Sequence, residues 1–309
     1  MAFPRKLKQR WEVYPTLKDV LKATDNLSVS PFGKTEEGLT DFRGIQLVPP
    51  KHNPNARKLE DRFPKVEKII CKEDFKNADF SGSLWFDIKL ERADGENVTL
   101  ENVRFAGSKF DGYYSHWFAT VIGGNFDNCV FKGFSFFDLK DCQFTNIKKS
   151  SRLDLNTGLV ENCLFEGYIY KGMFYTTLKN CKIVGTLYDC RFAVTSSEEP
   201  IKYENVDATE ANFVICSVWH HDFSELKTSP NTCVVKLTDA FFEAALSLAK
   251  AHPTMAEALE KEVKMWLKPH STKPYDIVDI DNLTALKAPE ELSKAYYEVV
   301  VKAKEITKA

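Results

Sequence analysis

The phrase NCVFKG at residues 128–133 returns in altered form along the middle of the chain. Every copy places a small residue (Ala, Val or Cys) two positions before a large apolar residue (Phe or Ile). Side chains two positions apart lie on the same face of a β-strand. The phrase therefore predicts a short strand with both apolar side chains on one face. The other copies are NADFSG at 77–82, NVRFAG at 102–107, NCLFEG at 162–167 and NCKIVG at 180–185, with weaker ones, DCQFTN at 141–146 and DCRFAV at 189–194.

The copies belong to a frame of five residues. From 206 to 225 this frame runs without interruption as VDATE, ANFVI, CSVWH and HDFSE. A period of five fits neither an α-helix nor a hairpin sheet, so we expect a coil in which each short side points one apolar residue inward. The frame is broken at 88–97, 147–158 and 193–205, and we interpret these segments as loops.

The frame resembles that of the pentapeptide-repeat proteins, whose consensus is a small residue, Asp or Asn, Leu or Phe, a polar residue and Gly. ADFSG at 78–82 matches at all five positions, while SKFDG, VRFAG, CVFKG, CLFEG and ANFVI match in part. The resemblance covers residues 71–226. It implies a mainly β protein, a right-handed quadrilateral parallel β-helix with turns about 4.8 Å apart. The chain departs from the pattern because its central residue is mostly Phe, and because the Asp or Asn before it is often replaced.

The inward positions of this coil define a predicted core rich in phenylalanine and cysteine. A free cysteine behaves as a compact hydrophobe, whereas a metal ligand or nucleophile needs convergent His or Asp partners. We therefore interpret the cysteines as structural. The predicted core residues are Phe80, Phe105, Phe110, Cys129, Phe131, Cys142, Phe144, Cys163, Phe165, Cys181, Ile183, Cys190, Phe192, Phe213, Cys216, Val218 and Phe223.

The change of period along the chain predicts three regions. These are an N-terminal extension and cap over 1–65, the coil over 66–226, and a C-terminal helical segment over 227–309. GLTDFRGIQL at 38–47 contains the pentapeptide-like TDFRG, and we expect it to form an N-terminal rung or a cap laid on the coil. The basic run at 51–68 is either a solvated loop or a contact for an acidic partner or nucleic acid.

Helical periodicity replaces the frame after about residue 236. Apolar residues at three- and four-residue steps predict a helix over 239–251, a second beginning at a Thr254–Glu257 capping box and ending near Leu267, and a third from Pro289. Trp266 is expected on the apolar face of the second helix. The helices either cap the coil or form a homodimer interface. YDIVDIDNL at 275–283 is interpreted as a linker, since its aspartates do not fit a calcium loop.

Composition and charge limit the partners. The chain has 309 residues, of which 43% are hydrophobic and 28% charged, with a net charge of −2. Residues 71–226 carry 16 positive and 23 negative side chains, so direct nucleic-acid binding, which needs a basic face, is not expected. The sequence shows neither a membrane-spanning run nor a signal peptide, and we expect a cytoplasmic protein without membrane association.

A search for catalytic motifs favours a protein that is not an enzyme. The sequence contains no GxGxxG, GxxxxGK[ST], HExxH, GxSxG or CxxC. His220 and His221, beside Trp219 and Asp222, form the most reactive-looking cluster. The frame places His221 at an inward position, however, and a metal site would need a third ligand that the sequence does not identify. No cofactor or metal is predicted.

Two classes of function remain. The first is a non-catalytic protein-binding or protection protein; the resemblance implies a DNA-mimicking, resistance or immunity factor acting on gyrase, another topoisomerase or a toxin. The second is a carbohydrate-active β-helix lyase or hydrolase. If a protein binds, we expect it at the clustered charges of two of the predicted loops: Glu91, Arg92, Asp94, Glu96, Glu198, Glu199 and Glu204.

Overall fold

The computed structural model describes residues 4–49, 67–111, 116–155, 158–192, 200–270 and 272–308. Contacts divide the chain into two compact units, residues 1–167 and 168–309. The protein is mainly β, a parallel β-solenoid of about seven turns with C-terminal helices. This is the fold class that the resemblance implies; right-handedness and a four-sided cross-section stay predictions.

The N-terminal unit begins with three short helices, α1 (Arg5–Gln9), the 3₁₀ helix η1 (Arg10–Val13) and α2 (Leu17–Ala23). The segment 38–47 follows as two short strands, β1 (Thr40–Asp41) and β2 (Gln46–Leu47). They pair in parallel with β4 (Phe75–Asp79) and β5 (Leu84–Phe86) respectively. The expected N-terminal rung is therefore present.

The helices are fastened to this rung by a buried carboxylate. Asp41 accepts hydrogen bonds from the guanidinium groups of Arg10 and Arg43, while the indole of Trp11 donates to the Arg43 carbonyl at 2.9 Å. Burial opposes the ionisation of Asp41, but the hydrogen bonds from Arg10 and Arg43 outweigh it and hold the pKa well below its usual range. A side chain at Gly44 would place its Cβ 2.5 Å from the Leu7 carbonyl oxygen, so glycine permits the close approach of α1.

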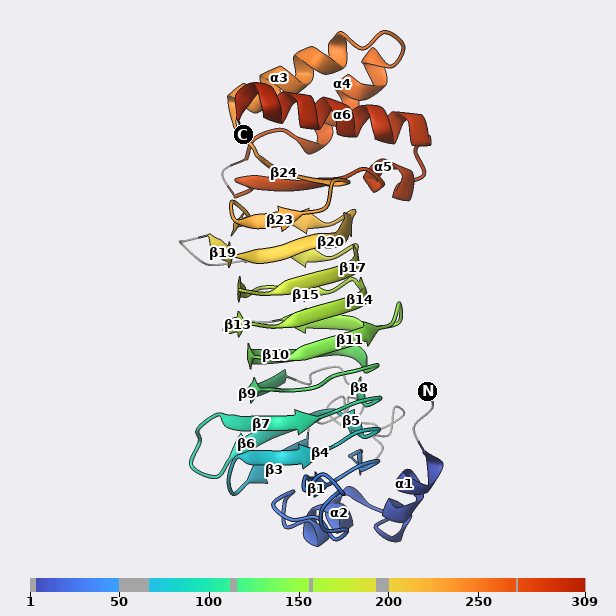
Figure 1. The fold of residues 1–309 in the computed structure, drawn as a ribbon, viewed down its shortest axis with the longest axis vertical. Helices are drawn as coiled ribbons and strands as arrows, with labels where there is room; N and C mark the ends of the chain where they lie inside the picture. Colours follow the sequence, from blue (N-terminus) through green and yellow to red (C-terminus); the bar gives the residue numbers. More distant parts are fainter. Residues whose placement is uncertain are drawn as a thin grey trace, which may run out of the picture. The chain divides into compact units, whose positions relative to one another are not determined.

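Parallel strands then wind through the rest of the N-terminal unit (Figure 1). Their pairing keeps equivalent residues opposite one another: Trp85 is paired with Phe110, Phe110 with Phe131, and Phe144 with Phe165. The remaining strands are β3 (Glu67–Cys71), β6 (Ile88–Arg92), β7 (Val98–Arg104), β8 (Lys109–Asp111), β9 (His116–Ile122), β10 (Val130–Lys140), β11 (Gln143–Ile147), β12 (Arg152–Leu155), β13 (Leu159–Glu161) and β14 (Leu164–Tyr170), the last of which ends in the second unit.

The C-terminal unit continues with short parallel strands. Phe174 lies opposite Phe192, and Phe192 lies opposite Val218, so the inward register is kept. The strands are β15 (Met173–Phe174), β16 (Thr177–Lys179), β17 (Lys182–Tyr188), β18 (Arg191–Phe192), β19 (Ile201–Glu204), β20 (Val206–Val214), β21 (Ser217–Val218), β22 (His221–Asp222) and β23 (Leu226–Thr228).

A column of stacked phenylalanine rings fills the interior of the N-terminal unit. Successive centroids lie 4.4–5.4 Å apart, with interplanar angles of 5–20°. All of the residues predicted for the core are buried. The rings of this column are Phe42, Phe80, Phe105, Phe126, Phe144 and Phe165.

The Asn that opens each copy of the phrase has a role that the sequence analysis did not assign. At Asn77, Asn102, Asn128, Asn162 and Asn180 the backbone is left-handed, with φ between +51° and +55°. Asn tolerates this conformation better than most residues, and here it turns the chain just before the small inward residue. The amides also bond between turns: Asn102 Nδ2 donates to Asn77 Oδ1 at 2.6 Å.

The segments interpreted as loops are only partly loops. Ile88–Arg92 forms β6, which pairs with β3 over five residues. Ile88 and Leu90 are buried and alternate with the more exposed Lys89 and Glu91, as in a strand with one inward face. Arg152–Leu155 and Ile201–Glu204 likewise form strands β12 and β19. The loop prediction was wrong for these residues, because period-2 alternation continues there after the five-residue frame is lost.

The helical segment folds over the last turn within the C-terminal unit (Figure 1). Its helices are α3 (Asp239–Lys250), α4 (Ala256–Trp266), the short α5 (Asn282–Ala285) and α6 (Glu290–Thr307). They share one apolar core, which includes Phe241, Leu259, Val263 and Val300. The described helices all lack the length and apolar character needed to span a bilayer.

Two expectations for this segment were wrong. The helix α4 has no capping box: Met255 precedes it without a side-chain cap, and His252 Nδ1 accepts from the Met255 amide at 3.1 Å instead. Trp266 does not pack in the core, since its side chain is 41% exposed.

Residues 275–283 do not form the linker that the sequence predicted. Tyr275–Asp279 forms the strand β25, antiparallel to β24 (Thr232–Lys236). Buried Asp279 accepts from the amide of Phe213 in β20 at 3.2 Å and from the Thr232 hydroxyl at 2.7 Å. Asn282 Oδ1 accepts from the Ile215 amide at 2.7 Å. These side chains satisfy amides that the last coil turn leaves without a further strand.

We expect Phe105→Ala to lower the free energy of unfolding by about 3–5 kcal/mol, because it opens a cavity between two stacked neighbours. Phe105→Leu, which places the consensus side chain there, should cost less than about 1.5 kcal/mol. Urea unfolding followed by circular dichroism measures both. Equal losses for the two variants would contradict the packing described for the column.

We expect Asp279→Ala to lower the free energy of unfolding by about 2–4 kcal/mol, because two buried donors lose their acceptor. The matched control is Asp281→Ala, which removes an exposed carboxylate two residues away and should change stability by less than about 0.5 kcal/mol. Hydrogen exchange of the Phe213 amide gives a local readout. Unchanged protection of that amide in Asp279→Ala would show that the carboxylate does not close the coil.

Candidate binding surfaces

The outer wall of each unit carries lysines and carboxylates joined between neighbouring strands. In the N-terminal unit Glu91 accepts from Lys89 at 2.7 Å and lies 3.2 Å from Lys68 of the paired strand β3. In the C-terminal unit Lys182 of β17 lies 2.6 Å from Glu210 of β20. Other lysine–carboxylate pairs of this kind are Lys76–Glu101, Lys132–Asp111, Lys140–Glu161 and Lys171–Asp189. The wall therefore presents mixed charge, with lysines and carboxylates paired between strands.

The residues predicted to bind protein are distributed over several elements. Glu91 and Arg92 lie on β6, and Asp94 and Glu96 lie in the turn after it. Arg92 Nη2 donates to Asp94 at 2.5 Å, and the Glu96 amide donates to Asp94 Oδ1 at 3.1 Å. The turn is thus an ordered charged projection of the N-terminal unit.

The other predicted segment belongs to the C-terminal unit. Glu204 ends strand β19, while Glu198 and Glu199 lie outside the described residues. Glu204 lines a hollow of about 240 Å³ together with Lys202, Asp222 and Glu225. Glu225 accepts from the Asn205 amide at 3.3 Å.

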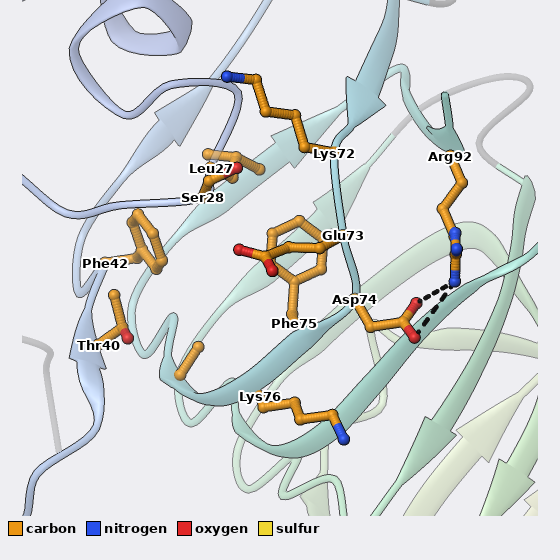
Figure 2. A pocket seen from close by; sticks show the side chains of 11 residues that line it. Leu27, Ser28, Thr40, Phe42, Lys72, Glu73, Asp74, Phe75, Lys76 and Arg92 are labelled. Carbon is orange, nitrogen blue, oxygen red and sulfur yellow. Dashed lines mark hydrogen bonds and ion pairs between the residues drawn. The ribbon is translucent and has the colours of Figure 1, made fainter. Parts of the chain in front are cut away.

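A polar cleft of about 440 Å³ lies beside Arg92 in the N-terminal unit. Figure 2 shows Arg92 pointing toward Asp74. Phe42 and Phe75 also line the cleft. Each cation of the cleft has a carboxylate partner within the unit: Arg92 pairs with Asp74 at 3.4 Å, Lys72 with Asp25 at 2.6 Å, and Lys76 with Glu101 at 3.0 Å. The cleft is therefore electrostatically self-compensated.

The histidine cluster is split between surface and interior. His220 is a corner residue with φ +54°, and Trp219 is 44% exposed. His221 is buried, with its ring 5.6 Å from those of Tyr203 and Phe223. Its Nδ1 is 2.8 Å from the Trp219 carbonyl oxygen, whereas Nε2 has no hydrogen-bond partner among the described residues. The described residues also hold no cluster of three ligands for a metal ion.

Three of the buried cysteines are poor nucleophiles in this fold. Burial raises the pKa of the Cys71 thiol to about 12, and burial also raises the pKa of Cys129 and Cys216 well above the ordinary value. A thiol with a raised pKa is protonated at neutral pH, and only the thiolate attacks or binds metals readily. The raised pKa values of these three thiols agree with a structural role.

No family model matches the sequence, and no curated protein matches it. Among solved structures it is similar to QnrB1, a plasmid-mediated fluoroquinolone resistance protein, with 12% identity. The alignment covers 62% of this chain and 92% of that one, with a TM-score of 0.17. A TM-score this low lends no support to a shared function.

We expect stability to fall as the pH falls from 6.5 to 4. Burial lowers the pKa of His221 from 6.5 to about 4, so in this window the unfolded chain takes up a proton that the folded chain does not. The loss approaches about 3 kcal/mol at pH 4. His221→Leu should remove this component of the pH dependence, and His270→Leu, which replaces an exposed histidine, is the control. Denaturant titrations at several pH values measure it. An unchanged slope in His221→Leu would assign the dependence to other groups.

Proposed function

We propose that the protein is a non-catalytic scaffold that binds a protein partner on the outer wall of its coil. The observation that carries this proposal is the combination of a filled interior with an outer wall of paired charges. Stacked rings 4.4–5.4 Å apart leave no space for a ligand between turns of the N-terminal unit, so recognition there is left to the outside.

The arrangement of charge on the wall favours recognition over catalysis. A glycan lyase or hydrolase uses acid and base groups that converge on one sugar ring, commonly a pair of carboxylates. On the described wall the carboxylates of Glu91, Glu101 and Glu210 face lysines of neighbouring strands instead. Such pairs give the surface a pattern of mixed charge that is complementary to an oppositely patterned partner.

The pairing of lysines with carboxylates also limits which protein partner fits the wall. The resemblance to pentapeptide-repeat proteins supplies two candidates, a type II topoisomerase such as gyrase and a toxin-like protein. Imitation of duplex DNA would require rows of uncompensated negative charge. Because lysines neutralise many of the described carboxylates, we propose a partner recognised through mixed charge, in a resistance or immunity role.

We place the contact at the turn after β6. Asp94 and Glu96 project there from a strand that is itself paired along its whole length, so the turn is rigidly presented. The segment 193–205, with Glu198, Glu199 and Glu204, is proposed as a second contact.

Affinity capture tests this assignment. The intact tagged protein should recover a protein partner from lysate of its source cells, and binding should weaken as salt rises because the contact is charged. Replacing residues 93–97 with a Gly/Ser turn of equal length should reduce recovery at least about tenfold. Glu298→Lys, at an exposed position of α6, is the surface control and should leave recovery unchanged.

A supercoiling assay with purified gyrase, with and without a fluoroquinolone, tests the topoisomerase candidate directly. Protection that disappears in the Gly/Ser variant would identify the partner as gyrase. Absence of any captured protein, together with no effect on gyrase, would refute the scaffold proposal. Recovery that is unaffected by the turn replacement would refute only the position of the contact.

A further inference from the structure

A second surface lies wholly within the C-terminal unit, where a cavity of about 430 Å³ opens beside the last coil strands. Three segments form it: residues 215–219 around β21, the end of α4 with the loop after it, and the stretch from β25 into α5. Tyr296 of α6 and Asp189, which follows β17, also line it. Small-molecule sites commonly have volumes of about 300–1,000 Å³, so this cavity has the size of a ligand site.

Exposed apolar side chains are concentrated at this cavity. Eleven large apolar residues are exposed among the described ones, and four of them line this single site. The exposed fractions range from 41% to 54%. Single exposed apolar residues are common on protein surfaces, whereas a contiguous group marks an interaction site. The four are Trp219, Met265, Trp266 and Leu286.

The loop that carries the polar side of the cavity is held in place. The His220 amide donates to the Thr272 carbonyl at 2.8 Å, which ties the loop to the coil. Trp266 Nε1 donates to Glu262 at 2.9 Å, which restrains one indole. The ring of Trp219 stands edge-on to that of His270, with centroids 6.1 Å apart. The site is therefore largely preformed, which lowers the entropic cost of binding.

The carboxylates that line the cavity are paired with cations, whereas one of its lysines is not paired with a carboxylate. Its two carboxylates already have cationic partners, since Asp276 lies 2.8 Å from Lys273 and Asp189 lies 3.7 Å from Lys171. Lys273 also donates to the Trp266 carbonyl at 3.3 Å, which occupies an acceptor at the end of α4. Lys268, in contrast, has no carboxylate within ion-pair distance among the described residues, and it is exposed beside the indoles. The free charge at the mouth is thus positive.

We propose that this cavity binds a small organic anion, an aromatic or alkyl group bearing one anionic oxygen group. The apolar part would lie against Trp219, Met265 and Trp266, and the anionic group would meet Lys268. An apolar surface with one unneutralised cation is complementary to such a molecule, and burial of the apolar part supplies most of the affinity. This site is separate from the partner contact proposed on the outer wall of the N-terminal unit.

A pair of dyes tests the proposal on the intact protein. Anilinonaphthalene sulfonate is aromatic and anionic, and N-phenylnaphthylamine is its uncharged analogue. We expect saturable binding of both dyes, with the anionic dye bound more tightly. Trp219→Ala should weaken both about tenfold, and Lys268→Gln should weaken only the anionic dye, about threefold. Fluorescence titration measures the dissociation constants.

Two further variants keep the test valid if Trp219→Ala disturbs folding. Met265→Glu places a negative charge at the mouth on a side chain that is 54% exposed, and it should weaken the anionic dye more than the neutral one. Ile306→Glu, at a 65% exposed position of α6, is the matched control and should change neither dissociation constant. Lack of saturable binding, or binding that survives both Met265→Glu and Lys268→Gln, would overturn the proposal. Equal weakening of both dyes by Lys268→Gln would overturn its anionic part.

Discussion

The spacing of parallel strands is the constraint on which the rest of this structure depends. Backbone hydrogen bonds hold neighbouring turns about 4.8 Å apart, and this distance is not adjustable by side chains. An inward residue therefore contacts the equivalent residue one turn away, and only side chains that pack at this spacing are stable there. Flat phenylalanine rings meet the requirement by stacking, as Phe105 does between Phe80 and Phe126. The small residue two positions earlier, often cysteine, leaves room for the rings.

The same hydrogen bonding leaves unpaired backbone groups at the first and last turns of the coil. A parallel coil cannot close on itself, so its terminal turns expose amides and carbonyls that would pair with another chain. At the N-terminus the helices cover the first rung and Arg10 holds it through Asp41. In the C-terminal unit β25 lies over the coil, and Asp279 and Asn282 accept from amides that no further strand can satisfy. Both attachments use a buried or half-buried polar side chain. At the C-terminal end these side chains also accept from coil amides, which an apolar side chain would cover without satisfying.

Sequence reasoning could predict whatever repeats. The five-residue frame identified the inward positions, and these are buried, because the same spacing rule applies at every turn. The frame did not predict the features that the spacing between turns does not determine. The Asn at each corner could have been assigned from its recurrence before the small residue, since Asn tolerates the left-handed conformation. The strands β6 and β12 were missed because an irregular turn can keep period-2 alternation while the frame of five is lost. The role of Asp279 depends on a contact 66 residues away in the chain, and no local pattern encodes it.

The C-terminal cavity follows from the way the helical segment is joined to the coil. A cap that matched the last turn side chain for side chain would leave no space between them. Here the attachment includes a few directed hydrogen bonds, from Phe213 and Ile215 to β25 and α5 and from His220 to the loop after α4. Directed bonds fix position without filling volume, so the large side chains of Trp219 and Trp266 border the remaining space instead of packing into a core. The coil interior, whose packing is fixed by its own spacing, has no comparable freedom. New binding capacity in such a fold therefore arises most readily where the repeat stops.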